Sequence, residues 1–84
     1  MNIYEQLGKR IAYLRKQKKM SQMDFALEAG INKNYLCDLE NGKRNPTLLI
    51  LNKIARCLKI NLSTLFQGIE DFTIEDFVNA VSKK

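Results

Sequence analysis

Three polar side chains that lie close together in the sequence could read the edges of DNA bases. Lys33 and Asn34 are adjacent, and Asp38 follows about one helical turn later. Lysine can donate hydrogen bonds to guanine O6 and N7, asparagine can bind adenine N6 and N7, and aspartate can accept from cytosine N4. The same three residues would also suit an ordinary polar helix surface, so their meaning depends on the elements around them.

A second group of side chains suits phosphates rather than bases. Lys43 and Arg44 supply two positive charges within a polar turn, and Asn41 can donate hydrogen bonds from its side-chain amide beside them. Contacts of this kind position a protein on the DNA backbone without carrying sequence information. The Tyr35 hydroxyl could reach a phosphate, or its ring could pack on a neighbouring helix, and we expect the phosphate contact.

Two short helices joined by a tight turn are predicted to position these groups. The first covers about residues 21–29 and the second about residues 32–41. Gly30 separates the two helical patterns because glycine readily adopts a positive φ. Ser21 and Asn32 have side-chain oxygens that can cap the two helix N-termini, because they can accept hydrogen bonds from free backbone N–H groups. The base-reading candidates therefore begin in the first turn of the second helix.

Three further helices complete a chain that we predict to be all-α. The first covers about residues 3–18. The second begins after the cap Thr47 and ends near Leu58, and the third covers about residues 63–66 with Ser63 as its cap. Apolar side chains at helical spacing would face one core. The core positions predicted in these three helices are Leu7, Ile11, Leu14, Leu48, Leu51, Ile54, Ala55, Leu58, Leu65 and Phe66.

A set of short motifs, specific only when taken together, runs from about Leu7 to Phe66. The motifs are Leu14-Arg15, Ser21-Gln22, Phe25-Ala26, Ala29-Gly30-Ile31, Tyr35-Leu36, Leu39-Glu40-Asn41-Gly42, Arg44-Asn45-Pro46 and Ile54-Ala55. In this order and spacing the chain resembles helix-turn-helix domains of the phage-repressor and Cro type, the xenobiotic-response-element family. The resemblance covers most of the chain.

The resemblance implies a compact five-helix, lambda-repressor-like domain whose second and third helices form the helix-turn-helix, followed by a short C-terminal helix. It implies that Arg15 forms a bidentate bond with Glu40, which would join the first helix to the end of the recognition helix. It also implies that Gln22 contacts a DNA phosphate. The phosphate-contact candidates are then Gln22, Asn32, Tyr35, Asn41, Lys43 and Arg44.

Positive charge is concentrated in the first part of the chain. Residues 1–67 contain 12 Lys and Arg against 5 Asp and Glu, a net charge of +7, and residues 68–84 contain 2 against 4. A basic body indicates a polyanion as the partner, and here we expect double-stranded DNA. We expect no cofactor and no small-molecule ligand, because 84 residues leave no room for a separate effector domain.

Several functions are disfavoured by the residues that the sequence lacks. It contains no His, no glycine-rich phosphate loop and no paired acids in a plausible cleft, so we predict that the protein is not an enzyme. The two Cys fall in helical patterns without metal-ligand spacing, which indicates reduced thiols and no metal site. No run is long and apolar enough for a signal peptide or membrane span. We therefore expect a cytoplasmic, nucleoid-associated protein.

Gly68 is predicted to separate a helix-turn-helix domain, residues 1–67, from a helical extension, residues 68–84. Thr73 and Asp76 match a capping box at the start of this extension. Its apolar residues, Ile74, Phe77, Val78 and Val81, would share one helix face. Such a face has to dock on its own domain, on a second subunit or on another protein.

We hypothesise that the protein is a sequence-specific transcriptional regulator that binds a palindromic operator as a homodimer, either a repressor or a restriction–modification controller. One recognition helix covers only a few base pairs, so pairing two of them supplies the missing specificity. The alternative is an antitoxin-like interaction module that neutralises a partner and autoregulates its operon. The residues predicted to form the dimer interface are Ile60, Leu62, Leu65, Phe66 and Phe77.

Overall fold

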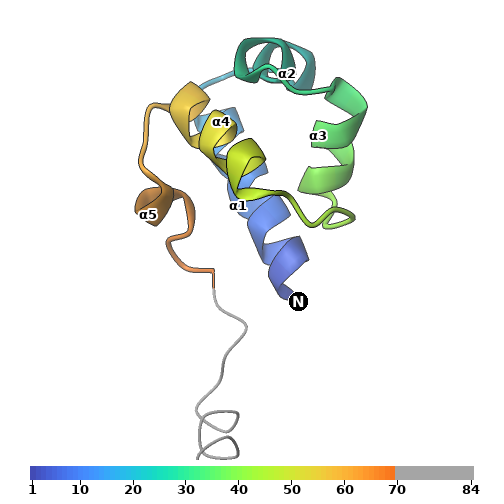
Figure 1. Ribbon diagram of the computed structural model, residues 1–84, viewed down its shortest axis with the longest axis vertical. Helices are drawn as coiled ribbons and strands as arrows, with labels where there is room; N and C mark the ends of the chain where they lie inside the picture. The colour runs from blue at the N-terminus through green and yellow to red at the C-terminus, as the bar shows by residue number, and fades with distance from the viewer. Residues whose placement is uncertain (70–84) are drawn as a thin grey trace, which may run out of the picture.

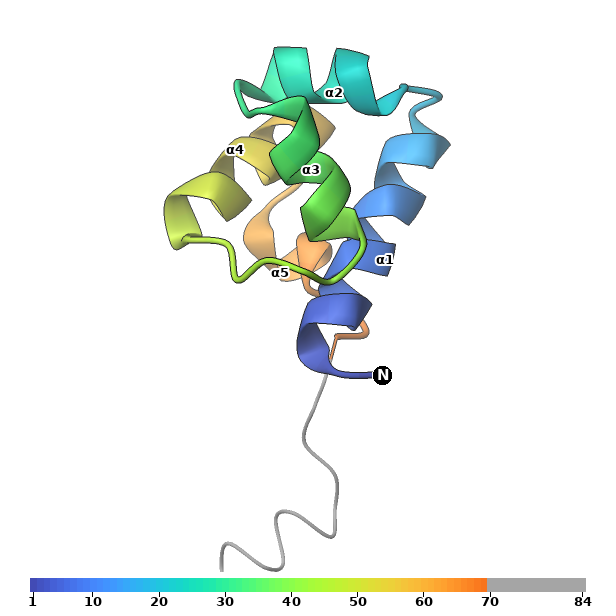
Figure 2. The same ribbon diagram turned by 90° about the vertical axis from the view of Figure 1, so that its right-hand side faces the viewer.

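The computed structural model describes residues 1–69, and this part of the chain folds into five helices without a strand (Figure 1 and Figure 2). The predicted all-α, five-helix class is confirmed, and α2 and α3 form the predicted helix-turn-helix. The helices are α1 (Ile3–Gln17), α2 (Gln22–Ala29), α3 (Lys33–Glu40), α4 (Leu48–Leu58) and α5 (Leu62–Leu65).

A short polar side chain caps the N-terminus of each of the five described helices by accepting a hydrogen bond from a backbone N–H. The predicted caps of α2, α3 and α4 are confirmed. For α5 the prediction of Ser63 is wrong, because Asn61 Oδ1 accepts from Thr64 N at 2.8 Å and the helix already begins at Leu62. Asn2 caps α1 in a reciprocal capping box with Glu5, which the sequence analysis did not find.

One hydrophobic core is built from all five helices. Its largest fully buried side chains are Ile11, Phe25, Leu36, Leu39, Ile54, Leu58 and Leu65. Helix α1 packs on α3, α2 packs on both α3 and α4, and α4 packs on α5. The prediction of Leu48 as a core residue is wrong, since it is 68% exposed at the first turn of α4.

The end of α5 is part of this core and is held there by α1. Leu65 has no exposed surface, so the prediction that it forms a dimer interface is wrong. A side chain that is buried in its own subunit has no area left to bury against a second one. Arg10 on α1 donates to the carbonyl of Thr64 at 2.8 Å and to that of Leu65 at 3.3 Å. These bonds join α5 to α1 across the domain.

The packed domain continues beyond the predicted boundary at residue 67. Gly68 adopts a φ of +81°, and Ile69 packs partly buried against the core, with its N–H donating to the Phe66 carbonyl at 3.0 Å. The predictions for the extension, including the capping box at Thr73 and an interface role for Phe77, lie outside the described residues.

Candidate nucleic-acid interface

The turn between α2 and α3 is set by a glycine and an asparagine. Gly30 adopts the left-handed conformation with φ +75°, and the N–H of Ile31 donates to the Ala26 carbonyl at 3.0 Å. Asn32 then accepts from the backbone N–H groups of Asn34 at 2.8 Å and Tyr35 at 3.1 Å. These bonds complete the end of α2 and the start of α3, as the sequence predicts.

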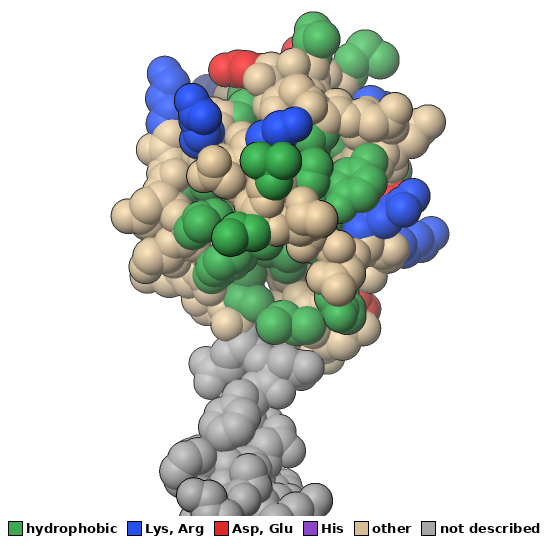
Figure 3. Space-filling view, in the orientation of Figure 1, with side chains coloured by type: hydrophobic (Ala, Val, Ile, Leu, Met, Phe, Trp, Pro, Cys, Tyr) green, Lys and Arg blue, Asp and Glu red, His purple; other side chains and the backbone are tan. Residues whose placement is uncertain are grey.

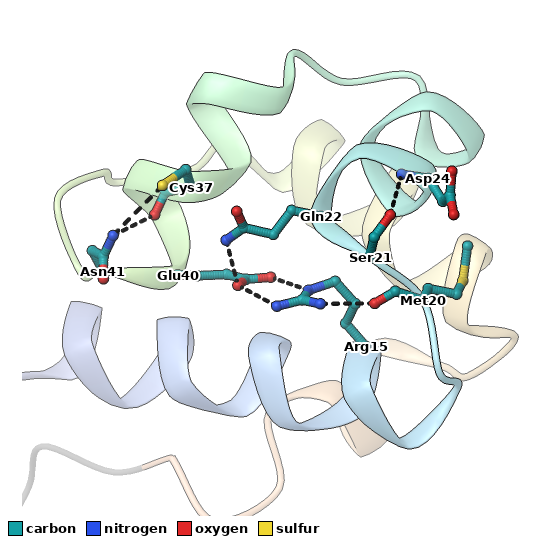
Figure 4. A network of polar contacts seen from close by, with 8 residues as sticks. All are labelled: Arg15, Met20, Ser21, Gln22, Asp24, Cys37, Glu40 and Asn41. Carbon is teal, nitrogen blue, oxygen red and sulfur yellow. Dashed lines mark hydrogen bonds and ion pairs between the residues drawn. The ribbon is translucent and has the colours of Figure 1, made fainter.

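A buried ion pair anchors the C-terminal end of α3 (Figure 4). Arg15 donates to both carboxylate oxygens of Glu40, from Nε at 2.7 Å and from its second terminal nitrogen at 2.9 Å, so the predicted bidentate pair is confirmed. The side chains are only 8% and 6% exposed. The hydrogen bonds to Glu40 raise the pKa of Arg15 although burial acts against them. The Arg15 guanidinium therefore keeps its positive charge beside the Glu40 carboxylate.

The same ion pair contacts two further segments, one through Glu40 and the other through Arg15. Gln22, at the start of α2, donates from Nε2 to Glu40 Oε1 at 3.0 Å, and Arg15 also donates to the Met20 carbonyl at 2.7 Å. Figure 4 shows these groups converging between α1, α2 and α3. The family resemblance implies that Gln22 contacts a phosphate, and this internal contact was not predicted. The side-chain amide still has a second N–H for an external acceptor.

Close backbone contact between α1 and α3 fixes the recognition helix further. A Cβ added to Gly8 would lie 2.5 Å from the carbonyl oxygens of both Leu39 and Glu40. Gly42, just after α3, has φ +76°, and a Cβ there would lie 2.9 Å from the Cα of Glu5. Only glycine permits these approaches, so α1 contacts the end of α3 at Gly8 and the turn after α3 at Gly42.

Lys33 and Asn34 lie exposed in the first turn of α3, the position predicted for base contacts. Within residues 1–69 neither side chain has a hydrogen-bond or ion-pair partner, since the bond at Asn34 is made by its backbone. Both are therefore free to bind an external ligand.

Asp38 differs from the other two base-reading candidates because it has an internal partner. Its carboxylate accepts from Arg44 at 3.3 Å, in an ion pair that remains half exposed. The Arg44 guanidinium also lies 5.2 Å from the centroid of the Tyr35 ring. The three side chains thus form one cluster on the outer side of α3 and the loop after it, and a base contact by Asp38 would compete with Arg44.

Asn41 is also partly engaged. Its side-chain nitrogen donates to the Cys37 carbonyl at 3.0 Å, one turn back in α3. Lys43 is exposed, and its backbone N–H donates to the Asp38 carbonyl at 2.9 Å, which holds the loop against the helix. The loop therefore presents its cations from a fixed backbone.

Tyr4 joins this region although it was not predicted as a site residue. A hollow beside the loop is lined by Tyr4, Gly42, Lys43, Arg44 and Asn45. Tyr4 lies three residues before the core residue Leu7, and that helical spacing was the available signal.

Within residues 1–69, no three His, Cys, Asp or Glu side chains gather as metal ligands would. No helix in this part of the chain is long and apolar enough to cross a membrane.

Comparison with known proteins also identifies the chain as a helix-turn-helix protein. A family model described as a helix-turn-helix domain matches residues 8–71. The control protein C.MunI from Mycoplasma sp. is 44% identical over 64 residues, which is 75% of this chain and 86% of that protein. The immunity repressor protein of Bacillus phage phi105 is 36% identical over 59 residues, 70% of this chain and 41% of the repressor.

Solved structures agree with the fold. The restriction-modification controller protein C.AhdI from Aeromonas hydrophila superposes with a TM-score of 0.73 at 33% identity, covering 75% of this chain and 96% of that one. The names of these relatives are those of controllers and repressors. The chain therefore belongs to the helix-turn-helix domain family, whose members of the phage-repressor and Cro type are DNA-binding transcription regulators and not enzymes.

Proposed function

We propose that the protein binds a palindromic DNA operator as a homodimer and regulates transcription in a sequence-specific way. The observation that carries this proposal is the first turn of α3, where Lys33 and Asn34 are exposed and have no partner within residues 1–69. The N-terminal turn of such a helix is the part that enters the major groove. Lysine and asparagine are side chains that distinguish guanine and adenine there.

The anchoring of α3 supports base reading rather than loose electrostatic attachment. The buried Arg15–Glu40 pair and the contact at Gly8 hold the helix at its C-terminal half. A base-reading side chain has to present its donors within a few tenths of an ångström, and a fixed helix lets it do so at a small entropic cost.

The phosphate contacts come from the groups around α3. Lys43 is exposed, and Arg44 retains donors beyond the one that it gives to Asp38. The amides of Gln22, Asn32 and Asn41 each keep at least one N–H that no internal bond uses. Together with the Tyr35 hydroxyl, these groups would hold the DNA backbone while the first turn of α3 reads the bases.

The dimer surface that we propose is centred on two exposed leucines of α4 and the partly buried Leu62 of α5. Leu48 is 68% and Leu49 is 64% exposed, and both line a shallow hollow with Leu62. In Figure 1, α5 and α3 lie on opposite sides of the domain, so a contact there leaves α3 uncovered. A two-fold contact would bury the same apolar patch on both subunits. Ile60, from the predicted interface, would lie at its edge, whereas Phe66 lines a separate hollow with Tyr4 and Ile69.

Similarity to control proteins favours the controller role. C.MunI is 44% identical and C.AhdI is 33% identical to this chain, each over 75% of it. We therefore propose a regulator of a restriction–modification operon that responds to its own concentration.

Selection of bound sequences from a random DNA pool tests the proposal. The wild-type protein should select a palindrome, and Lys33→Ala should lose about 1–3 kcal/mol on that site and relax the consensus at one position in each half. Arg44→Ala should instead weaken specific and non-specific DNA about equally. Lys9→Ala, at an exposed position of α1, is the control for a lost positive charge. An unchanged consensus for Lys33→Ala would refute the assignment of this residue. Operator binding by the purified protein alone would weigh against the antitoxin-like alternative.

Sedimentation tests the dimer surface. Leu49→Asp should shift the protein to a monomer that keeps its helical content, because a charge would then be buried in the interface. Gln67→Glu, which is exposed and outside the leucine patch, should leave the dimer intact. A dimer that is unaffected by Leu49→Asp would place the interface elsewhere.

A further inference from the structure

An apolar groove lies where the start of α1, the loop before α4, the beginning of α4 and the segment after α5 meet. It has a volume of about 370 Å³, and its lining is almost entirely apolar. Figure 3 shows hydrophobic side chains gathered on this lower part of the molecule, next to the point where the described chain ends. The lining residues used below are Ile3, Tyr4, Leu51, Phe66 and Ile69.

The groove leaves large apolar side chains exposed. Ile3 is 41%, Tyr4 is 40% and Phe66 is 37% exposed, and the three lie on one continuous surface. Exposed apolar surface of this kind usually marks a place where something docks. A small polar ligand is a poor fit, because such sites need several converging polar groups and this lining has few.

We propose that residues 72–81 of the same subunit occupy this groove with their apolar side chains. The last described residue, Ile69, is itself part of the lining, and 15 residues follow it in the sequence. Ile74, Phe77, Val78 and Val81 are spaced so that one helix face could present all four. Residues 70 and 71 are long enough to let the chain turn back, since an extended residue spans up to about 3.5 Å.

The charges beside the groove favour the same occupant. Tyr4 and Asn45 line both the groove and the hollow that contains Lys43 and Arg44. The first seven residues after Ile69 include four acids and no Lys or Arg. Their placement at the groove would set negative charges near two exposed cations. A basic segment would instead be repelled there.

The segment of the same subunit is a better occupant than that of a second copy. It is tethered by only two residues, so its effective concentration at the groove is high and no translational freedom is lost on docking. Exchange between subunits would need the same apolar contacts and would also depend on protein concentration. The proposal therefore assigns Phe77 to its own domain and leaves the dimer surface to the leucines of α4 and α5.

Disulfide trapping tests the proposal in the full chain. Tyr4→Cys is combined in turn with Phe77→Cys and with Val78→Cys, after Cys37 and Cys57 have been replaced by Ala. Under oxidation at least one pair should form a reducible cross-link within the monomer, which migrates faster on a non-reducing denaturing gel. A cross-linked dimer band, or no cross-link with either pair, would overturn the proposal.

Two controls separate specific docking from chance collision. Tyr13→Cys with Phe77→Cys should not cross-link, because Tyr13 is 55% exposed on α1 and does not line the groove. In thermal unfolding, Phe77→Asp should lower the melting temperature by several degrees, whereas Asn79→Asp should not, because helical spacing would put residue 79 on the face opposite the four apolar residues. Equal cross-linking of the Tyr13 pair, or equal melting temperatures for the two Asp variants, would count against a docked segment.

Discussion

Gly8→Ala is a substitution for which helix propensity and the tertiary structure predict opposite signs. Gly8 lies in the interior of α1, where Ala is ordinarily more favourable than Gly by about 1 kcal/mol. In the folded domain, however, the new Cβ would lie 2.5 Å from two carbonyl oxygens of α3, and ordinary contact begins at 3.4 Å. The difference means that α1 and α3 would have to separate by about 0.9 Å.

The expected result is a net loss of stability. Forcing extra volume into a packed site typically costs about 1–3 kcal/mol. We expect the upper end here, because the contacted atoms are backbone and cannot rotate away. After subtraction of the gain in helix propensity, about 2 kcal/mol of destabilisation remains, which corresponds to roughly 8–16 °C in the melting temperature of a domain of this size. The separation would also lengthen the Arg15–Glu40 bonds and lower operator affinity.

Urea unfolding followed by circular dichroism measures this loss, and a DNA titration measures the affinity. Gly30→Ala is the matched control, because nothing lies within 4 Å of its added Cβ but its φ is +75°. It should cost about 1–2 kcal/mol through the backbone alone and leave the affinity of the folded protein unchanged. If Gly8→Ala were more stable than the wild type by about 1 kcal/mol, the close approach of α1 and α3 would be refuted.

Three further predictions concern the contacts around the core. Arg15→Ala should destabilise the domain by about 3–5 kcal/mol, since it leaves the Glu40 carboxylate buried without its partner, whereas replacing both residues by Met should cost much less in urea unfolding. Arg10→Ala should cost about 1–2 kcal/mol in the same assay, because α5 loses two hydrogen bonds from α1. Burial, and secondarily the charge of Glu28, raise the pKa of the Cys57 thiol above its ordinary value of 9.0. The stability that this shift contributes is therefore complete below pH 9.0 and is lost as the pH rises through the higher pKa of the folded state. The wild type should therefore lose more stability than Cys57→Ala between about pH 8 and about pH 10, and equal losses would contradict this.

Local signals in the sequence predicted much of the site. Gly30 and Asn32 define the turn through backbone chemistry that acts within a few residues, and the structure places both as expected. Arg15 and Glu40 are 25 residues apart in the sequence, so no local rule predicts their ion pair. The prediction of this pair came from the family resemblance. The ion pair between Asp38 and Arg44 was not predicted, because Arg44 lies beyond the end of α3, where helical spacing no longer indicates which side chains meet.

The sequence by itself determined the helices, the caps of α2, α3 and α4, and the turn, because hydrophobic periodicity and capping depend on neighbours within one or two turns. Only the tertiary structure decided which apolar residues are buried. Leu48 and Leu65 are both leucines on helical stripes, yet one is 68% exposed and the other has no exposed surface. The tertiary structure also decided the roles of Gly8 and Gly42, which permit close contact of α1 with the end of α3 and with the turn after it. Their roles depend on where another helix crosses, and that position results from packing the whole core at once.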